Sequence, residues 1–142
     1  IKGDLYRGSL LNFWCVRPVS ADTLFAFDGS SLSQKGKAEI KKVSSQIKAR
    51  TKELLAASSY LSISAHTDRL GSDSYNQTLS EKRLHAVLNE LKNNSVDMKL
   101  IKEAKAFGEA KPVTGNECLD LPRKEQIRCY QPDRRVEIKV IK

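Results

Sequence analysis

The sequence predicts an α+β fold in which a mixed β-sheet carries helices packed on one of its faces. Four short segments have the composition of strands, at residues 22–27, 61–66, 102–107 and 136–140. Two long segments with apolar residues at helical spacing separate the first three of them. The predicted order of elements is therefore β-α-β-α-β-β. Because crossovers between parallel strands are almost always right-handed, we expect that hand here.

The first strand, residues 22–27, is followed by a turn that begins at Asp28. We expect a helix from this turn to about Leu55, since Ser31 and Gln34 have the spacing of a capping box. The apolar residues of this helix fall on one stripe with lysines opposite, which predicts an amphipathic helix packed on the sheet. The stripe consists of Ile40, Val43, Ile47 and Leu54.

The second strand, residues 61–66, alternates apolar residues with serine and histidine, so one face should be buried and the other polar. It ends in a turn-rich loop, residues 67–72, in which Gly71 can adopt a positive φ at no steric cost. Ser72 and Ser74 offer N-cap oxygens to the helix that follows. The buried positions expected in that helix are Leu84, Val87, Leu88 and Leu91.

The last third of the chain is less regular. Residues 96–101 predict a short helical turn, and residues 102–107 predict an edge strand with one charged face, as exposed edges often have. Residues 108–131 form a long segment without periodicity, which contains two prolines and two cysteines. Alternation with period two returns at residues 136–140, which predicts a final strand with one buried face.

Residues 1–19 have no clean period, and we predict that they form an N-terminal linker or packed arm ahead of one domain over residues 20–142. The segment contains large apolar side chains, among them Phe13 and Trp14, so we expect it to pack on the domain or to contact a partner. Cys15 also falls in this segment.

The composition, with 39% hydrophobic and 30% charged residues, is typical of a folded globular domain and excludes a disordered chain. No segment approaches the roughly 20 consecutive apolar residues of a membrane-spanning helix. The net charge of +8 is compatible with a nucleic-acid partner, but aromatic residues make up only 6% and acids are interspersed among the bases. We therefore expect no nucleic-acid partner and keep nucleic-acid binding as a less favoured alternative.

Two opposite charges stand close to the loop at residues 67–72. Asp68 lies in that loop, while Asn76, Ser80 and Arg83 share one side of the following helix at spacings of i, i+4 and i+7. Arg83, which we expect at the helix surface, can thus lie over the loop that holds Asp68. An acid and a guanidinium at one cleft suit a small zwitterion, but the same two residues can also form a structural ion pair beside a turn. The spacing alone leaves both interpretations open.

The motif around these charges is similar to the signature of OmpA-like peptidoglycan-binding domains. Three further segments match the family, so the resemblance spans about residues 20 to 142. One departure is Ala65 before His66, where the family often has glycine. The matching motifs are His66-Thr67-Asp68-x-x-Gly71-x-x-x-x-Asn76-x-x-Leu79-Ser80-x-x-Arg83-x-x-x-Val87, Leu24-Phe25-Ala26-Phe27-Asp28, Gly108-Glu109-x-x-Pro112-Val113 and Pro132-Asp133-Arg134-Arg135-Val136-Glu137-Ile138.

This resemblance implies a non-catalytic module of the periplasm that binds peptidoglycan through the diaminopimelate of its stem peptide and anchors an envelope protein or complex. Asp68 would accept from the ammonium of this residue, and Arg83 would grip its carboxylate. Of the pair Arg134 and Arg135, we expect the first to be structural or to face the pocket. The implied partners are peptidoglycan and a membrane-anchored remainder of the protein or an envelope complex, with a homodimer possible. The residues implied to shape the loop, the pocket and its rim are Thr67, Leu70, Asn76, Leu79, Phe27 and Asp28.

Cys118 and Cys129 are eleven positions apart, and neither has metal-ligand spacing to the two histidines. They form either a disulfide that closes a surface loop or two free thiols. Some members of the resembled family carry two cysteines ahead of the Pro-Asp-Arg-Arg motif, which favours the disulfide and an oxidising compartment.

Catalysis is not expected. Ser64, His66 and Asp68 contain the residue types of an acyl-transfer triad, but they lie within five residues of one strand and no nucleophile elbow is present. Asp28 and Asp68 could be imagined as a glycosidase pair, yet nothing in the sequence holds one of them neutral. We expect no cofactor and no metal. The remaining alternative is an envelope scaffold that acts through the aromatic N-terminal arm.

Overall fold

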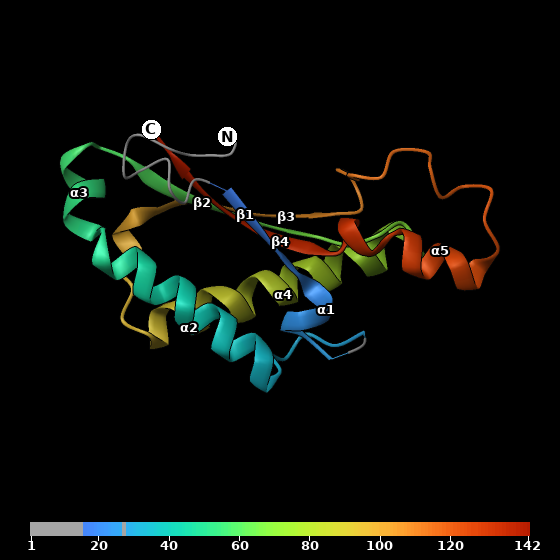
Figure 1. Cartoon of the computed structure of the whole chain (residues 1–142), viewed down its shortest axis with the longest axis horizontal. Coiled ribbons are helices and arrows are strands. Elements are labelled where there is room, and N and C mark those ends of the chain that lie inside the picture. The colour runs from blue at the N-terminus through green and yellow to red at the C-terminus, as the bar shows by residue number, and fades with distance from the viewer. Residues whose placement is uncertain (1–15, 27) are drawn as a thin grey trace.

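A computed structural model describes residues 16–26 and 28–142 and shows a four-stranded mixed sheet with its long helices on one face (Figure 1). The predicted α+β class and its one-sided helical layer are confirmed. Among the described residues, no helix is both long enough and apolar enough to cross a membrane. The elements are β1 (Val16–Ser20), α1 (Ala21–Leu24), α2 (Gln34–Ala49), α3 (Thr51–Ala56), β2 (Tyr60–His66), α4 (Asp73–Asn93), β3 (Ile101–Gly108), α5 (Arg123–Cys129) and β4 (Arg135–Ile141), with 3-10 turns at Met98–Leu100 and Gln131–Asp133.

The strands lie in the order β1-β4-β2-β3. β2 and β3 are parallel, whereas β4 is antiparallel to both of its neighbours, β1 and β2. β3 is therefore an edge strand, as predicted from its charged face. The other edge is β1, which brings the beginning of the described chain beside its end. This arrangement sets the first helix, α1, next to the segment that leads into β4.

The expected strand at residues 22–27 is wrong. The chain leaves the sheet at Ser20, whose side chain accepts a hydrogen bond from the backbone N–H of Asp22 and so starts the short helix α1. Phe25 forms only an isolated bridge with Leu32. The strand of the sheet is instead β1, which includes residues 16–19 of the predicted arm. The rest of that arm, Cys15 included, lies outside the described residues.

The helix expected between Asp28 and Leu55 is two helices, α2 and α3, separated at Arg50, whose backbone is not helical. The N-cap of α2 is Ser33 rather than Ser31, since the Ser33 hydroxyl accepts from the N–H of Gly36 at 2.9 Å. The N-cap of α4 is Ser72, which accepts from the N–H of Tyr75. Ser72 is one of the two N-cap residues predicted for α4, so only the cap of α2 is a correction, by two positions within a serine-rich turn.

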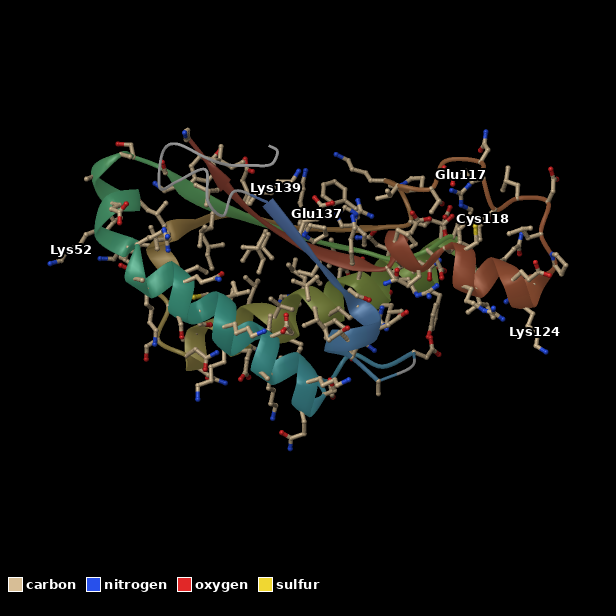
Figure 2. The ribbon with its side chains drawn as sticks, viewed as in Figure 1. Lys52, Glu117, Cys118, Lys124, Glu137 and Lys139 are labelled. Carbon is tan, nitrogen blue, oxygen red and sulfur yellow. A yellow bond between two sulfur atoms is a disulfide. The ribbon has the colours of Figure 1, made fainter. Side chains whose placement is uncertain are left out.

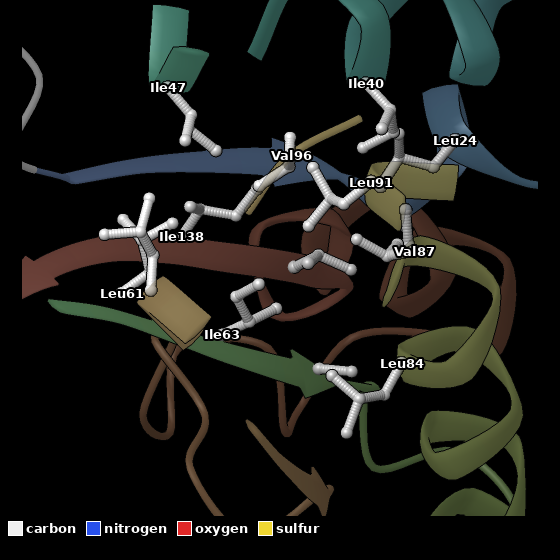
Figure 3. Packing of buried hydrophobic residues seen from close by; sticks show 14 of the residues in the cluster. Leu24, Ile40, Ile47, Leu61, Ile63, Leu84, Val87, Leu91, Val96 and Ile138 are labelled. Atoms are coloured by element: carbon white, nitrogen blue, oxygen red, sulfur yellow. The ribbon is translucent and has the colours of Figure 1, made fainter. Parts of the chain in front are cut away.

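The core lies between the sheet and the helices, and side chains from β2, β4, α2 and α4 point into it together (Figure 3). The apolar stripe predicted for each helix faces this layer. Val43 and Leu88 are only partly buried at its edge. Its fully or almost fully buried members include Leu24, Ile40, Ile47, Leu54, Leu61, Ile63, Leu84, Val87, Leu91, Val96 and Ile138.

The start of α2 packs directly against the end of α1. A Cβ on Gly36 would lie 2.9 Å from the Cα of Leu24 and closer still to its carbonyl oxygen, so only glycine fits. Ser33 reinforces this contact, because its backbone N–H and its hydroxyl both donate to the carbonyl of Leu24. The loop between the two helices is thereby held at both ends.

The face of the sheet opposite the helices is polar, with Glu137 and Lys139 standing out from β4 (Figure 2). His66 lies buried in this face, stacked on Phe107 with ring centroids 5.2 Å apart, and its Nε2 lies 2.9 Å from the Ser64 hydroxyl. Burial, followed by the positive charge of Arg135, lowers the pKa of His66 from 6.5 to about 4.

Replacement of Gly36 by alanine tests the contact between α1 and α2. In an ordinary helix interior, alanine is about 0.5–1 kcal/mol more favourable than glycine. Here the added Cβ meets backbone atoms of Leu24, so we expect Gly36→Ala to lower the free energy of unfolding in urea by about 1–3 kcal/mol. The exposed neighbour Lys35→Ala is the matched control and should change it by less than about 0.5 kcal/mol. A stabilised Gly36→Ala protein would contradict the packing.

His66 should make the stability depend on pH. Because its pKa is lower in the folded chain (about 4) than in the unfolded chain (about 6.5), the unfolded state binds more protons between these values. The free energy of unfolding should therefore fall as the pH drops from about 6.5 through about 4, by on the order of 1–3 kcal/mol. In a His85→Gln background, His66 is the single histidine, and its ring protons should titrate near pH 4 by NMR. Titration above pH 6 would sink this assignment.

Candidate ligand-binding site

A cavity of about 500 Å³ opens where α1, the end of β2, the start of α4 and α5 meet. We call it the charged cavity, because three arginines and three aspartates contribute to its wall. Eight of the residues proposed from the sequence lie in this wall, and the ninth, Phe27, is outside the described residues. The wall is formed by Ala21, Asp22, Phe25, Ala26, Asp28, Thr67, Asp68, Leu70, Gly71, Tyr75, Asn76, Leu79, Arg83, Arg123, Ile127 and Arg134.

The loop after β2 is fixed by its own polar groups. An Asp68 carboxylate oxygen accepts from the backbone N–H of Leu70 at 3.0 Å, and Gly71 has a φ of +95° that suits glycine. The side-chain amide of Asn76, which is 3% exposed, donates to the carbonyls of Asp68 and Leu70 and to a Glu109 carboxylate oxygen. Asn76 therefore shapes the loop from the first turn of α4 and presents the Asp68 carboxylate to the cavity.

Arg134 connects this loop to two other walls of the cavity. One of its terminal nitrogens donates to Asp68 at 2.7 Å and to the carbonyl of Ile127 at 2.9 Å. Its Nε and the other terminal nitrogen each donate to one carboxylate oxygen of Asp22 at 3.0 Å. Burial opposes the charge of Arg134, but the hydrogen bonds to Asp22 and Asp68 outweigh it and raise its pKa.

Arg83 lies on α4 with only 6% of its surface exposed, so the expectation that it sits at the helix surface is wrong. The loop between α1 and α2 covers it. Its Nε donates to the carbonyl of Gly29 at 2.8 Å, and its guanidinium carbon lies 5.0 Å from the centre of the Phe25 ring. Burial lowers its pKa, while the negative charges of Asp22 and Asp28 act in the opposite direction.

Asp68 and Arg83 do not form an ion pair in the described part of the chain, since Asp68 is paired with Arg134 instead. The two terminal NH₂ groups of Arg83 have no hydrogen-bond partner among the described residues. The structure thus places a carboxylate and an incompletely bonded guanidinium in the wall of one cavity, held apart rather than joined. What they bind stays a prediction.

At the mouth of the cavity, the Tyr75 hydroxyl donates to an Asp28 carboxylate oxygen at 2.6 Å, which raises the pKa of Tyr75. Asp28 has a φ of +57°, a left-handed conformation that aspartate tolerates better than most residues. Tyr75 is not among the site residues predicted from the sequence. Its position one residue before Asn76 on the first turn of α4 is the signal that could have found it.

The structure also distinguishes the two adjacent arginines. Arg134 faces the charged cavity, whereas Arg135 belongs to β4 and lies on the opposite side of the sheet. There Arg135 pairs with Glu137 at 2.6 Å and donates to the main-chain carbonyls of Asp133 and Lys111. Arg135 is therefore a structural residue of the polar face.

Helix α5 forms a wall that the sequence did not predict, because residues 108–131 have no helical period. Cys118 and Cys129 are joined by a disulfide with their Cα atoms 5.8 Å apart, which agrees with the predicted pairing (Figure 2). The side-chain amide of Gln126 donates to the carbonyls of Cys118 and Leu119 inside this loop. The loop thus holds α5 beside the cavity, where Arg123 and Ile127 contribute to the wall.

Solved structures share this fold. A putative MotB-like protein from Desulfovibrio vulgaris superposes with a TM-score of 0.70 and 18% sequence identity, over 89% of this chain and 72% of that one. The peptidoglycan-associated lipoprotein from Burkholderia pseudomallei gives a TM-score of 0.62 and 20% identity, over 90% of this chain and 91% of that one. At these identities the likeness concerns the fold alone.

The sequence comparisons find relatives of higher identity than these solved structures. Outer membrane protein A of Salmonella typhi is 39% identical over 123 residues, which cover 86% of this chain and 34% of that protein. Outer membrane protein A of Escherichia fergusonii is 37% identical, over 86% of this chain and 49% of that one. The chain thus spans a third to a half of the length of these relatives. A family model described as the OmpA family matches residues 24–126, and the chain belongs to that family.

Proposed function

We propose that this domain binds peptidoglycan through the diaminopimelate of its stem peptide and thereby anchors an envelope protein or complex to the cell wall. The observation that carries the proposal is that Asp68 and an incompletely bonded Arg83 both lie in the wall of one cavity without binding each other. The free end of diaminopimelate is a zwitterion, with an ammonium and a carboxylate on one carbon. The two protein groups are complementary to these two charges.

Each group retains the capacity to bind. A carboxylate has about four lone-pair positions, and Asp68 uses one for Leu70 and one for Arg134, so an ammonium can still be accepted. Arg83 has its Nε engaged with Gly29, which fixes the guanidinium plane and leaves both terminal nitrogens for a carboxylate. Two parallel charge-assisted hydrogen bonds from a pre-positioned fork are stronger than one from a mobile lysine.

The cavity also fits the size and polarity of this ligand. Small-molecule sites commonly enclose about 300–1,000 Å³, and the charged cavity lies in this range with about 500 Å³. Phe25, Leu70, Leu79 and Ile127 supply apolar wall for the methylene groups of diaminopimelate. The volume suits one amino-acid side chain with its neighbours, so the glycan strands would remain outside.

The relatives and the disulfide support a place in the cell envelope. The names of two relatives refer to the outer membrane, and the name of a solved structure with this fold refers to association with peptidoglycan. Disulfides such as Cys118–Cys129 persist in oxidising compartments such as the periplasm. We therefore propose that the domain acts in the periplasm, as a non-catalytic part of a larger envelope protein or complex.

Pull-down on purified sacculi that contain diaminopimelate tests the proposal. Arg83→Gln keeps a donor for Gly29 but removes the fork, and Asp68→Asn removes the charge that attracts the ammonium. Each variant should lose about tenfold or more of wall binding, because each removes charge-assisted hydrogen bonds. The control is Lys52→Ala, which removes an exposed charge at the opposite end of the molecule (Figure 2).

Circular dichroism and urea unfolding should show that both variants remain folded. Wall binding that survives both substitutions would reject the zwitterion site. If the domain is instead retained on DNA with a steep salt dependence, and Asp68→Asn leaves that retention unchanged, the nucleic-acid alternative is favoured.

Arg134 should affect the affinity for the ligand indirectly, because it holds the Asp68 carboxylate in position. Arg134→Met removes the contact that fixes the Asp68 carboxylate and leaves Asp22 and Asp68 without the cation between them. We expect the affinity for a diaminopimelate stem peptide, measured by calorimetry, to fall about tenfold, with Arg134→Lys recovering part of it. Arg135→Met is the matched control: it should lower stability without changing the affinity, since Arg135 lies on the other face of the sheet. Equal losses of affinity in the two methionine variants would contradict this role.

A further inference from the structure

We propose that Arg123 on α5 forms a second anion-binding position in the charged cavity, which takes the chain-end carboxylate of the stem peptide. This inference rests on the function proposed above and adds a preference among the peptide ligands. The domain would favour stem peptides that end in a free carboxylate over those in which that carboxylate is blocked.

The argument begins with the arginines of the cavity wall. Arg134 is fully engaged, because its three nitrogens donate to Asp22, Asp68 and the carbonyl of Ile127. Arg83 has one nitrogen engaged and is assigned to the carboxylate of the zwitterion. Arg123 is exposed, and neither a hydrogen bond nor an ion pair joins it to any other described residue. A whole guanidinium in the cavity wall is therefore available to a ligand.

The wall that carries Arg123 is held in place. The disulfide between Cys118 and Cys129 closes the loop around α5, and Gln126 binds two carbonyls within that loop. Arg134 donates to the carbonyl of Ile127, which links α5 to the acid of the zwitterion site. Ile127 follows Arg123 by four positions, so both side chains lie on one side of the helix and both contribute to the cavity. Lys124, the next residue, points away from the body of the molecule (Figure 2).

The charged groups of the cavity wall that can still form hydrogen bonds indicate which charges the ligand carries. Asp68 can accept an ammonium, and so can Asp28 at the mouth, which accepts only from Tyr75 among the described residues. Two guanidinium groups, Arg83 and Arg123, can each take a carboxylate. A diaminopimelate at the end of a stem peptide has this set: the ammonium and carboxylate of its side-chain end, and the carboxylate of the peptide chain end. Conversion of the chain-end carboxylate to an amide removes one charge and leaves the zwitterion intact.

Calorimetric titration with two synthetic tripeptides tests the inference. Both end in diaminopimelate with its side-chain end free, and the chain end is a carboxylate in one and a primary amide in the other. The wild-type domain should bind the acid about threefold to tenfold more tightly, as a partly exposed charge pair allows. Arg123→Ala should bind the acid only as tightly as the amide, with its affinity for the amide unchanged. Lys124→Ala removes the same charge from the neighbouring position and should keep the preference.

The outcomes separate this inference from the proposed function. Equal affinity of the wild-type domain for the two peptides would overturn the inference alone, and so would an equal loss of affinity for both in Arg123→Ala. If the wild-type domain binds neither peptide, the proposed function fails and the inference fails with it. Arg123 is exposed, and urea unfolding should show that its replacement leaves the fold unchanged.

Discussion

The guanidinium of Arg134 binds two carboxylates and a main-chain carbonyl that come from three separate parts of the chain. Asp22 comes from α1, Asp68 from the loop after β2, and Ile127 from α5. Without this cation, the carboxylates of Asp22 and Asp68 would both lose their ion-pair partner, which is costly in a partly buried site. The relative positions of three walls of the charged cavity therefore depend on one planar, permanently charged group that can donate in several directions.

Arg83 has the opposite character, although it lines the same cavity. It is more deeply buried than an arginine usually is, yet among the described residues only its Nε donates a hydrogen bond, to the carbonyl of Gly29. The loop that covers it is fixed by the contact of Gly36 with Leu24, so its burial follows from how α1 and α2 pack. The cavity thus contains one arginine that connects three parts of the protein and another whose terminal nitrogens we propose for a ligand.

Sequence patterns predicted the elements that depend on residues close to one another in the chain. The loop at 67–72 and the helix α4 follow from turn residues and a regular apolar period, and the structure has both. β1 was not predicted because residues 1–19 have no clean period, and the structure shows that this edge strand includes a proline, Pro18, as edge strands can. α5 was missed because tertiary contacts and a disulfide hold this short helix. The burial of Arg83 and the partner of Asp68 both depend on residues far away in the sequence, which periodicity cannot reveal.

The segments that hold Asp22 and Arg134, at the two ends of the described chain, form adjacent parts of the cavity wall. Asp22 and the arginine that binds it are 112 positions apart, and β1, the strand before Asp22, pairs with β4, the last strand. Because a protein is synthesised from its N-terminus, the residues of α2, β2 and α4 are made before those of β4. Contacts between segments this far apart carry a loop-closure entropy cost that local contacts do not. A partly synthesised chain therefore lacks Arg134, and the charged cavity is complete only after the final strand has joined the sheet.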